Sequence, residues 1–408
     1  MDQLPLQPIL LFALYVLIAR CSLIRGRTQW RSRAFALTNL VFVAALFYQV
    51  HAGAIRYAAY LGIVVISYVA MRLVAKAKGA LPWVAFSVPI LALVLIRYVP
   101  ALWWPMDKLF VGTHGTTGAA YFIGISYMAF RLSYLVWEVG NDSVPMPTLS
   151  EYLGFAFFVP TMVVGPINRF KTHREFLYGV NREATPVRRS LLRILIGAVK
   201  FQFAATLCNQ LAYQGLLLDL HRHSPVELGI AAVAYYLYLY LNFSGFCDIA
   251  IGAAGLIGVH VRENFDNPFA ARNVKDFWNR WHITLSEYVR DVVFAPLSRT
   301  LIIKLGPQSA NHAIACAIFV AFVLVGAWHG WGWHFVLFGV LHAFGVIVNH
   351  YYGTWLKKRL GTAGLKAYNA NPYITAAATM TTFLFVTATF FVFANDTSDM
   401  KQIFHAII

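Results

Sequence analysis

The residues that decide the fold class run from His312 to Gly353 and read HAIACAIFVAFVLVGAWHGWGWHFVLFGVLHAFGVIVNHYYG. Two apolar runs, at 312–328 and 334–353, flank a turn rich in tryptophan, glycine and histidine. Each run is long enough to cross most of a hydrocarbon layer that is roughly 30 Å thick. The stretch therefore predicts a pair of membrane helices with a histidine in the turn that joins them.

The rest of the chain is also rich in apolar residues and poor in charged ones. Of its 408 residues, 59% are hydrophobic and 12% are charged, whereas soluble domains are about 45–50% apolar and about 25% charged. This composition predicts an all-α multi-pass membrane protein, a single integral-membrane domain over 1–408 with about 10–12 transmembrane helices. The apolar runs fall at 4–24, 35–53, 57–75, 81–100, 118–138, 191–215, 226–258, 312–328, 334–353 and 372–394.

Charge and cysteine usage exclude several other classes of function. The net charge is +16, and the basic residues gather in loops between the apolar runs. The positive-inside rule predicts this pattern for cytoplasmic loops, so we expect no nucleic-acid partner. The four cysteines show no CxxC or Cys/His spacing, so neither disulfides nor zinc are expected. A metal site of His329, His334 and His342 is also disfavoured, because no carboxylate accompanies them.

Two segments depart from the pattern of long apolar runs. Residues 151–166 are apolar but too short to span, and Pro160 and Gly165 within them favour a re-entrant segment. Residues 277–291, FWNRWHITLSEYVRD, carry aromatic and apolar residues at three- and four-residue spacing, with charged residues between them. This second pattern predicts one basic helix that lies in the headgroup plane on the cytoplasmic side.

Five ionisable residues are candidates for chemistry. Arg131, Lys200 and Asp248 lie within apolar runs, where a charge marks a functional site, a buried ion pair or a polar group that lines a helix packing surface. His329 lies in a glycine-rich turn, and a neutral imidazole there can accept a proton from a hydroxyl group. The alternative for His329, and for His282 beside Trp281, is a histidine of the aromatic belt that only hydrogen-bonds a carbonyl. Both interpretations stay open on residue spacing alone.

A resemblance extends this interpretation. The run ENFDNPFAARNVKDFWNRWHITLSEYVRDVVFAPL at 263–297, followed by GAWHG at 326–330, resembles the signature of the membrane-bound O-acyltransferase (MBOAT) family. GISYMAFRLSYLVWE at 124–138, FFVPTMVVGPINRF at 157–170 and YLNFSGFCDIAIGAAGLIGV at 240–259 support it in the family's order. The resemblance implies helices around a central tunnel or funnel, with N-terminal helices at 1–115, a family core at 118–350 and C-terminal helices at 351–408.

The resemblance also implies roles for individual residues. His329 matches the family's near-invariant catalytic histidine, and His282 matches its second, cytoplasmic-side polar residue. The residues that we expect to line the substrate tunnel or support it are Asp248, Asn279, Arg280, Trp281, Ser286, Arg290 and Trp328.

The activity implied is transfer of an acyl group to a hydroxyl of a cell-envelope polymer or lipid-linked acceptor, at the bacterial cytoplasmic membrane. The donor would be a phosphopantetheine thioester on a carrier protein, with no tightly bound cofactor and with a second membrane-anchored transfer protein as a further partner. The compact length and the absence of a Gly-Gly turn after Leu297 favour the teichoic-acid D-alanyl branch, whereas Pro296 favours the branch that acetylates alginate. The alternative from another class is a transporter or flippase with Arg131, Lys200 and Asp248 as a charge relay.

Overall fold

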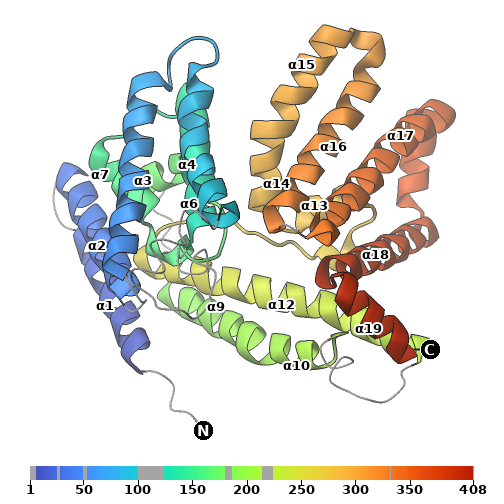
Figure 1. Cartoon of the computed structure of the whole chain (residues 1–408), viewed down its shortest axis with the longest axis horizontal. Helices are drawn as coiled ribbons and strands as arrows, with labels where there is room; N and C mark the ends of the chain where they lie inside the picture. Colours follow the sequence, from blue (N-terminus) through green and yellow to red (C-terminus); the bar gives the residue numbers. More distant parts are fainter. Residues whose placement is uncertain are drawn as a thin grey trace. The chain divides into compact units, whose positions relative to one another are not determined.

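The structure is a computed structural model that describes residues 6–24, 28–48, 53–99, 124–179, 186–213, 224–330 and 332–407. Within these ranges the regular secondary structure is helical, and the β pairing consists of an isolated bridge between Phe265 and Trp281. The chain forms two compact units (Figure 1): unit 1 is Met1–Ile196 with Phe246–Arg262, and unit 2 is Gly197–Gly245 with Glu263–Ile408. The single domain over 1–408 stays a prediction.

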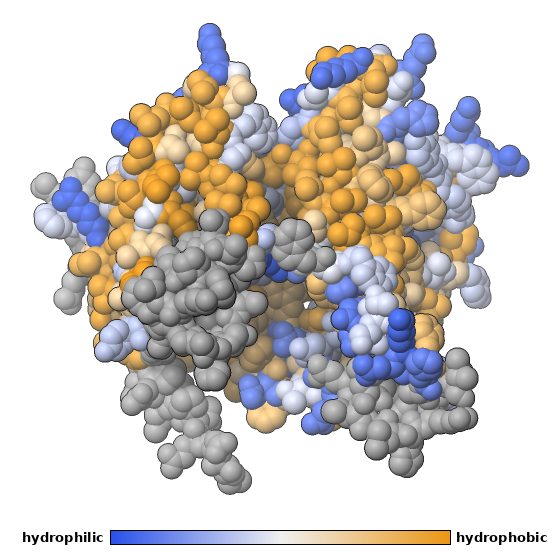
Figure 2. Space-filling view, in the orientation of Figure 1, coloured by the Kyte–Doolittle hydropathy of each residue, from blue (hydrophilic) through white to orange (hydrophobic). Residues whose placement is uncertain are grey.

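Seven helices in the described ranges are long and apolar enough to cross a membrane. Several large apolar side chains on them are exposed, as at Leu73 and Phe203, and such exposure suits contact with lipid. Figure 2 shows hydrophobic side chains over much of the visible face of each unit, with hydrophilic ones toward the helix ends. The all-α multi-pass prediction is confirmed, while the count of about 10–12 spans stays a prediction. The seven helices are Gly53–Val74, Leu81–Tyr98, Val187–Gln210, Pro225–Ile257, Pro307–His329, Trp333–Ala370 and Pro372–Ala394.

Unit 1 contains the N-terminal helices. Helix α3 packs on α4 and α4 on α6, while α2 packs on α1 and α7. Helix α7 has 8 residues and is followed by a 3₁₀ turn at Val159–Thr161, so this segment is too short to span, as the sequence predicts. Its re-entrant placement stays a prediction. The helices are α1 (Leu6–Ile24), α2 (Thr28–Tyr48), α3 (Gly53–Val74), α4 (Leu81–Tyr98), α6 (Ile125–Gly140), α7 (Leu149–Ala156), α8 (Phe170–Tyr178), most of α9 (Val187–Val199) and the end of α12 (Pro225–Ile257).

The fully buried Arg131 of α6 holds the α7 segment in place. Its guanidinium donates to the carbonyl oxygens of Phe155 and Ala156 at 2.8 and 3.3 Å. It also donates to the carbonyl and hydroxyl oxygens of Thr161 at 2.8 and 2.7 Å. Carbonyls at the C-terminal end of a helix lack intrahelical partners, and the planar guanidinium supplies several donors at once. This geometry favours a structural role for Arg131 over a mobile charge relay.

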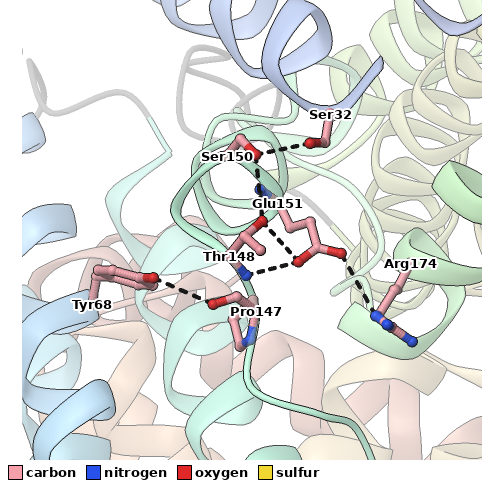
Figure 3. A network of polar contacts seen from close by, with 7 residues as sticks. All are labelled: Ser32, Tyr68, Pro147, Thr148, Ser150, Glu151 and Arg174. Atoms are coloured by element: carbon pink, nitrogen blue, oxygen red, sulfur yellow. Dashed lines mark hydrogen bonds and ion pairs between the residues drawn. The ribbon is translucent and has the colours of Figure 1, made fainter. Parts of the chain in front are cut away.

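A polar network ties α7 to its neighbours in unit 1 (Figure 3). Thr148 and Glu151 form a capping box: the Thr148 hydroxyl accepts from the Glu151 amide, and the Glu151 carboxylate accepts from the Thr148 amide at 2.7 Å. The same carboxylate lies 3.6 Å from the Nε of Arg174 on α8. Ser32 of α2 bonds the hydroxyl of Ser150 at 2.8 Å. The start of α7 is therefore fixed to two neighbouring helices.

Unit 2 contains the remaining helices. Helices α16 and α17 pack closely as a hairpin, and glycines permit the approach: a Cβ at Gly326 would lie 2.4 Å from the Phe335 carbonyl oxygen. The α17 helix breaks at Gly361, where φ is 64°. The elements are η4 (Lys200–Ala204, π-helical), α10 (Ala205–Gln210), the start of α12, α13 (Val274–Arg280), α14 (Ile283–Val289), η6 (Arg290–Phe294, π-helical), α15 (Ala295–Leu305), α16 (Ala310–His329), α17 (Trp333–Ala370), α18 (Pro372–Ala394) and α19 (Thr397–Ile407).

The prediction of one continuous interfacial helix over 277–291 is wrong. Helix α13 ends at Arg280, Trp281 is extended, and His282 adopts a left-handed backbone with φ 45° before α14 begins. The break occurs because a distant strand-like segment takes the hydrogen bonds: Asp266 donates to the Arg280 carbonyl, and Ile283 donates to the Asn264 carbonyl. The helical spacing of apolar residues is correct within each half, and most of these residues are buried in unit 2.

Candidate active site

The side chain of His282 is buried at the helix break, and its hydrogen bonds select one tautomer of the imidazole. The Nδ1 atom lies 3.2 Å from the side-chain oxygen of Asn264. That oxygen also accepts from the Thr284 amide at 3.1 Å and the Thr284 hydroxyl at 2.9 Å. Because the Thr284 amide is always a donor, the Asn264 atom is the oxygen, and Nδ1 of His282 must carry the hydrogen. The Nε2 atom is then unprotonated and able to accept a proton.

Burial keeps His282 neutral. It lies between α13 and α14, outside the helices long enough to span a membrane. Burial, and to a smaller extent the electrostatic effect of His329, lower the pKa of His282 to about 3. Both candidate histidines belong to unit 2, where ring contacts link Trp281, next to His282, through Phe390 and Phe393 to His329. The packing of unit 2 thus connects two residues that α14, η6, α15 and α16 separate in the chain.

His329 ends α16 inside an aromatic pocket. Its ring lies 4.6 Å from Trp328 and 4.9 Å from Phe393 of α18, between centroids, and the Phe393 contact is edge-to-face. Phe335 and Phe338 of α17 lie at 6.3 and 6.2 Å. His329 itself is only half-buried. A partly open imidazole among apolar rings can exchange a proton with a small substrate while bulk water is largely excluded.

His342 has a different role. It is fully buried, its Nδ1 accepts from Nε1 of Trp278 at 3.0 Å, and its Nε2 lies 2.9 Å from the Thr389 hydroxyl. The Thr389 hydroxyl donates to the Val386 carbonyl, so it accepts from Nε2 of His342. Both ring nitrogens are therefore engaged, and His342 links α13, α17 and α18 as a neutral structural group.

A cavity of about 1110 Å³ lies in unit 2, slightly above the range of roughly 300–1,000 Å³ typical of ligand pockets. Its inner wall is mostly apolar, with Trp278 and Phe322 among the lining side chains. Three residues expected from the sequence line it: Asn279, Ser286 and Arg290. Including Arg290, four exposed basic side chains line the cavity: Arg272, Lys275, Arg290 and Lys357. The cavity suits a ligand with an apolar body and an anionic end.

The other expected residues lie elsewhere. Arg280 donates to Asp276 at 3.0 Å and to the Asp266 carbonyl at 3.2 Å, which stabilises the end of α13. Trp281 is buried in an aromatic cluster that includes Phe277, stacked at 5.5 Å. Asp248 belongs to unit 1, where its carboxylate accepts from Arg193 at 3.0 Å. For Asp248 the structure therefore favours an ion pair, which is partly buried.

Several residues of the site escape sequence reasoning. Asn264, Phe338 and Phe393 act on the two histidines only through tertiary contacts. Trp278 and His342 are joined across 64 residues of chain. One signal was available for Asn264, which lies in the same motif run as His282.

The fold and site define a multi-pass α-helical membrane protein whose second unit holds two candidate histidines and a cavity with exposed basic side chains. The sequence pattern described as "MBOAT, membrane-bound O-acyltransferase family" matches residues 61–391. The chain belongs to this family and is a membrane O-acyltransferase.

Individual relatives point to two kinds of acyl transfer. The chain is 30% identical to a teichoic acid D-alanyltransferase of Streptococcus thermophilus, over 76% of this chain and 74% of that protein. It is 28% identical to the teichoic acid D-alanyltransferase of Bacillus subtilis, over 67% of this chain and 69% of that protein. It is also 28% identical to a probable alginate O-acetylase of Azotobacter vinelandii, over 57% of this chain and 43% of that protein.

Proposed function

We propose that the chain transfers a D-alanyl group from a carrier-protein thioester to a hydroxyl of teichoic acid or a related cell-envelope polymer. The observation that carries this proposal is the chain of ring contacts in unit 2 that links the segment of His282 to His329. The likeness to two teichoic acid D-alanyltransferases over two thirds or more of each chain supports the choice of acyl group and polymer. A transporter is disfavoured, because the chain belongs to an acyltransferase family.

The cavity of unit 2 is the proposed entrance for the donor. A phosphopantetheine arm has an apolar, flexible body and a phosphate at the end attached to the carrier protein. The apolar wall would accept the body, and Arg272, Lys275 and Lys357 would attract the phosphate and an acidic carrier surface. Asn279, Ser286 and Arg290 would contact the arm along its length. The chain itself would need no tightly bound cofactor.

His329 is the proposed general base. The acceptor oxygen attacks the thioester carbonyl carbon while its proton moves to the imidazole of His329. The tetrahedral intermediate then collapses, the C–S bond breaks, and the imidazolium returns the proton to the leaving thiolate. An ester and a free thiol result, with no net redox change. General base catalysis of this kind contributes on the order of 10²- to 10⁴-fold, and alignment of the two substrates contributes more.

His282 is the proposed supporting group. Its Nε2 carries a lone pair, because Nδ1 donates to Asn264. A neutral imidazole beside His329 can hold the acceptor hydroxyl or a bridging water by a hydrogen bond without competing for the proton. Its low pKa favours this positioning role over that of the main base. A second membrane-anchored transfer protein could then receive the acyl group before the polymer does.

The test uses the full chain in proteoliposomes with a radiolabelled D-alanyl carrier protein and teichoic acid as acceptor. His329→Gln is expected to lower the rate of ester formation by about 100-fold or more. His405→Gln, at an exposed histidine of α19, is the matched control and should leave the rate unchanged. Retention of full activity in a folded His329→Gln variant would contradict the assignment of the base.

The second candidate is O-acetyl transfer, favoured by the likeness to a probable alginate O-acetylase. The same vesicles with an acetyl-loaded carrier and alginate as acceptor decide between the two. Acetyl transfer to alginate without D-alanyl transfer to teichoic acid would replace the first proposal. The histidine chemistry would be the same in both cases.

A further inference from the structure

An aromatic group lies between the cavity and His329. Trp278 and Phe322 line the cavity, with ring centroids 5.2 Å apart. Behind them, Phe338 contacts both Trp278 and His329, at centroid distances of 6.5 and 6.2 Å. A chain of ring contacts thus connects the cavity wall to His329, along the passage that an acyl group would take.

The rings differ in how firmly they are held. Trp278 is buried, and its Nε1 donates to His342, which is itself held by Thr389. Moving the indole would break a buried hydrogen bond and leave Nδ1 of His342 without its donor. Phe338 has no polar atom, so its rotation exchanges only van der Waals contacts. Phe338 is therefore the ring that can turn aside, while Trp278 stays as the fixed side of the passage.

We infer that Trp278, held by His342, is a specificity-determining residue that sets the largest acyl group able to reach His329. The inference rests on the proposed function, because it takes the cavity as the donor entrance. A D-alanyl group carries only a methyl and an ammonium group on its α-carbon. An isobutyryl group has the same shape without the charge, whereas a phenylacetyl group is wider and longer. The wild-type chain should transfer the D-alanyl and isobutyryl groups and reject the phenylacetyl group.

The experiment measures kcat/KM for carrier protein loaded with D-alanyl, isobutyryl or phenylacetyl groups, in the proteoliposome assay described above. Trp278→Ala removes the fixed side of the passage and should raise the phenylacetyl-to-isobutyryl ratio by about tenfold or more, since small changes in pocket volume alter selectivity on that scale. Trp278→Leu keeps more buried apolar volume and serves if the alanine variant does not fold. His342→Leu keeps the indole but removes the acceptor of its hydrogen bond. It should raise the phenylacetyl-to-isobutyryl ratio by less than Trp278→Ala does.

The controls separate the possible failures. Trp355→Ala makes the same substitution at an exposed tryptophan that does not line the cavity, and its ratio should equal the wild-type ratio. An unchanged ratio in a folded Trp278 variant, or an equal rise in Trp355→Ala, overturns the inference. If the wild-type chain transfers no acyl group from any carrier thioester, the proposed function fails instead.

Discussion

The Nδ1 atom of His282 lies 3.2 Å from the side-chain oxygen of Asn264, and this pair decides which nitrogen of His282 can accept a proton. The backbone makes the contact possible, because His282 adopts a left-handed conformation where α13 ends. A left-handed backbone is uncommon for a residue other than glycine and is found at strained functional positions. The left-handed backbone at His282 therefore both interrupts the helix and orients the imidazole toward Asn264.

The first prediction concerns Asn264. Asn264→Ala removes the acceptor for Nδ1 of His282, so the imidazole can adopt the tautomer that presents N–H at Nε2. We expect kcat to fall by at least about tenfold, as when the partner that fixes a catalytic histidine's tautomer is lost. KM for the carrier protein should change little, because Asn264 does not line the cavity. Steady-state kinetics on the purified variant check this, and a wild-type kcat would contradict the proposed role of the pair.

The second prediction is a shift in pH dependence. With a pKa of about 3, His282 stays neutral throughout the physiological range, so it should contribute no acid limb to kcat/KM above pH 5. Asn264→Asp keeps an acceptor at the same place but adds a negative charge, which raises the pKa of His282. Protonated His282 has no lone pair to offer, so activity in this variant should begin to fall at a higher pH than in the wild type. pH–rate profiles of the two proteins test the direction.

The third prediction concerns His173 in unit 1. It is buried among aromatic rings, with Phe155 at 5.3 Å and Phe35 at 5.7 Å between centroids. Within the described residues, neither ring nitrogen has a hydrogen-bond partner. Burial, and then the charge of Arg131, lower the pKa of His173 to about 3. Since the unfolded chain binds the proton first, stability should be lost as the pH falls from about 6.5 toward 3, by up to roughly 1.4 kcal/mol per pH unit.

His173→Phe tests this loss. The substitution removes the titrating group and suits the aromatic surroundings, so thermal stability should fall less between pH 7.5 and 4.5 than in the wild type. The melting temperature in detergent at the two pH values is the measurement. His260→Phe, at an exposed position of the same unit, is the control and should keep the wild-type difference. Identical pH dependence in His173→Phe and the wild type would show that another group is responsible.

The fourth prediction concerns Arg131. Arg131→Met removes the donor for three carbonyl oxygens and one hydroxyl at the end of the α7 segment. Hydrogen bonds to a charged group contribute about 1.5–3 kcal/mol each, so we expect a loss of about 3 kcal/mol or more in stability. Arg131→Lys should recover little of it, because an ammonium cannot reproduce the planar fork.

Thermal unfolding of both variants and of Arg359→Met measures the effect. Arg359 is exposed on α17, so its loss removes a charge without removing buried bonds and should change the melting temperature little. Near-wild-type stability of Arg131→Met would show that the α7 segment is held mainly by other contacts, such as the Glu151 network (Figure 3).

Some features of the protein could be predicted from the sequence, whereas others depend on tertiary contacts. The membrane helices could be predicted because the length of an apolar run is a local property. Most of the described spans overlap a predicted run, but the helix that begins at Trp333 continues to Ala370, well beyond the predicted end at 353. His329 and His282 could be selected because they lie in a motif that resembles a known family. The roles of Asp248 and Arg280 could not be predicted, because the sequence does not reveal which partner lies close enough to a charged side chain to bond it.

The sequence by itself thus determined the multi-pass helical class and the family, and it selected the two histidines as candidates. Only the tertiary structure decided that the chain breaks at His282, that Asn264 orients it, and that Trp278 is fixed by His342. The physical reason is that apolar burial follows a short repeat along the chain, whereas each of these hydrogen bonds joins segments that the sequence separates. Such bonds are directional and exist only once the helices have packed.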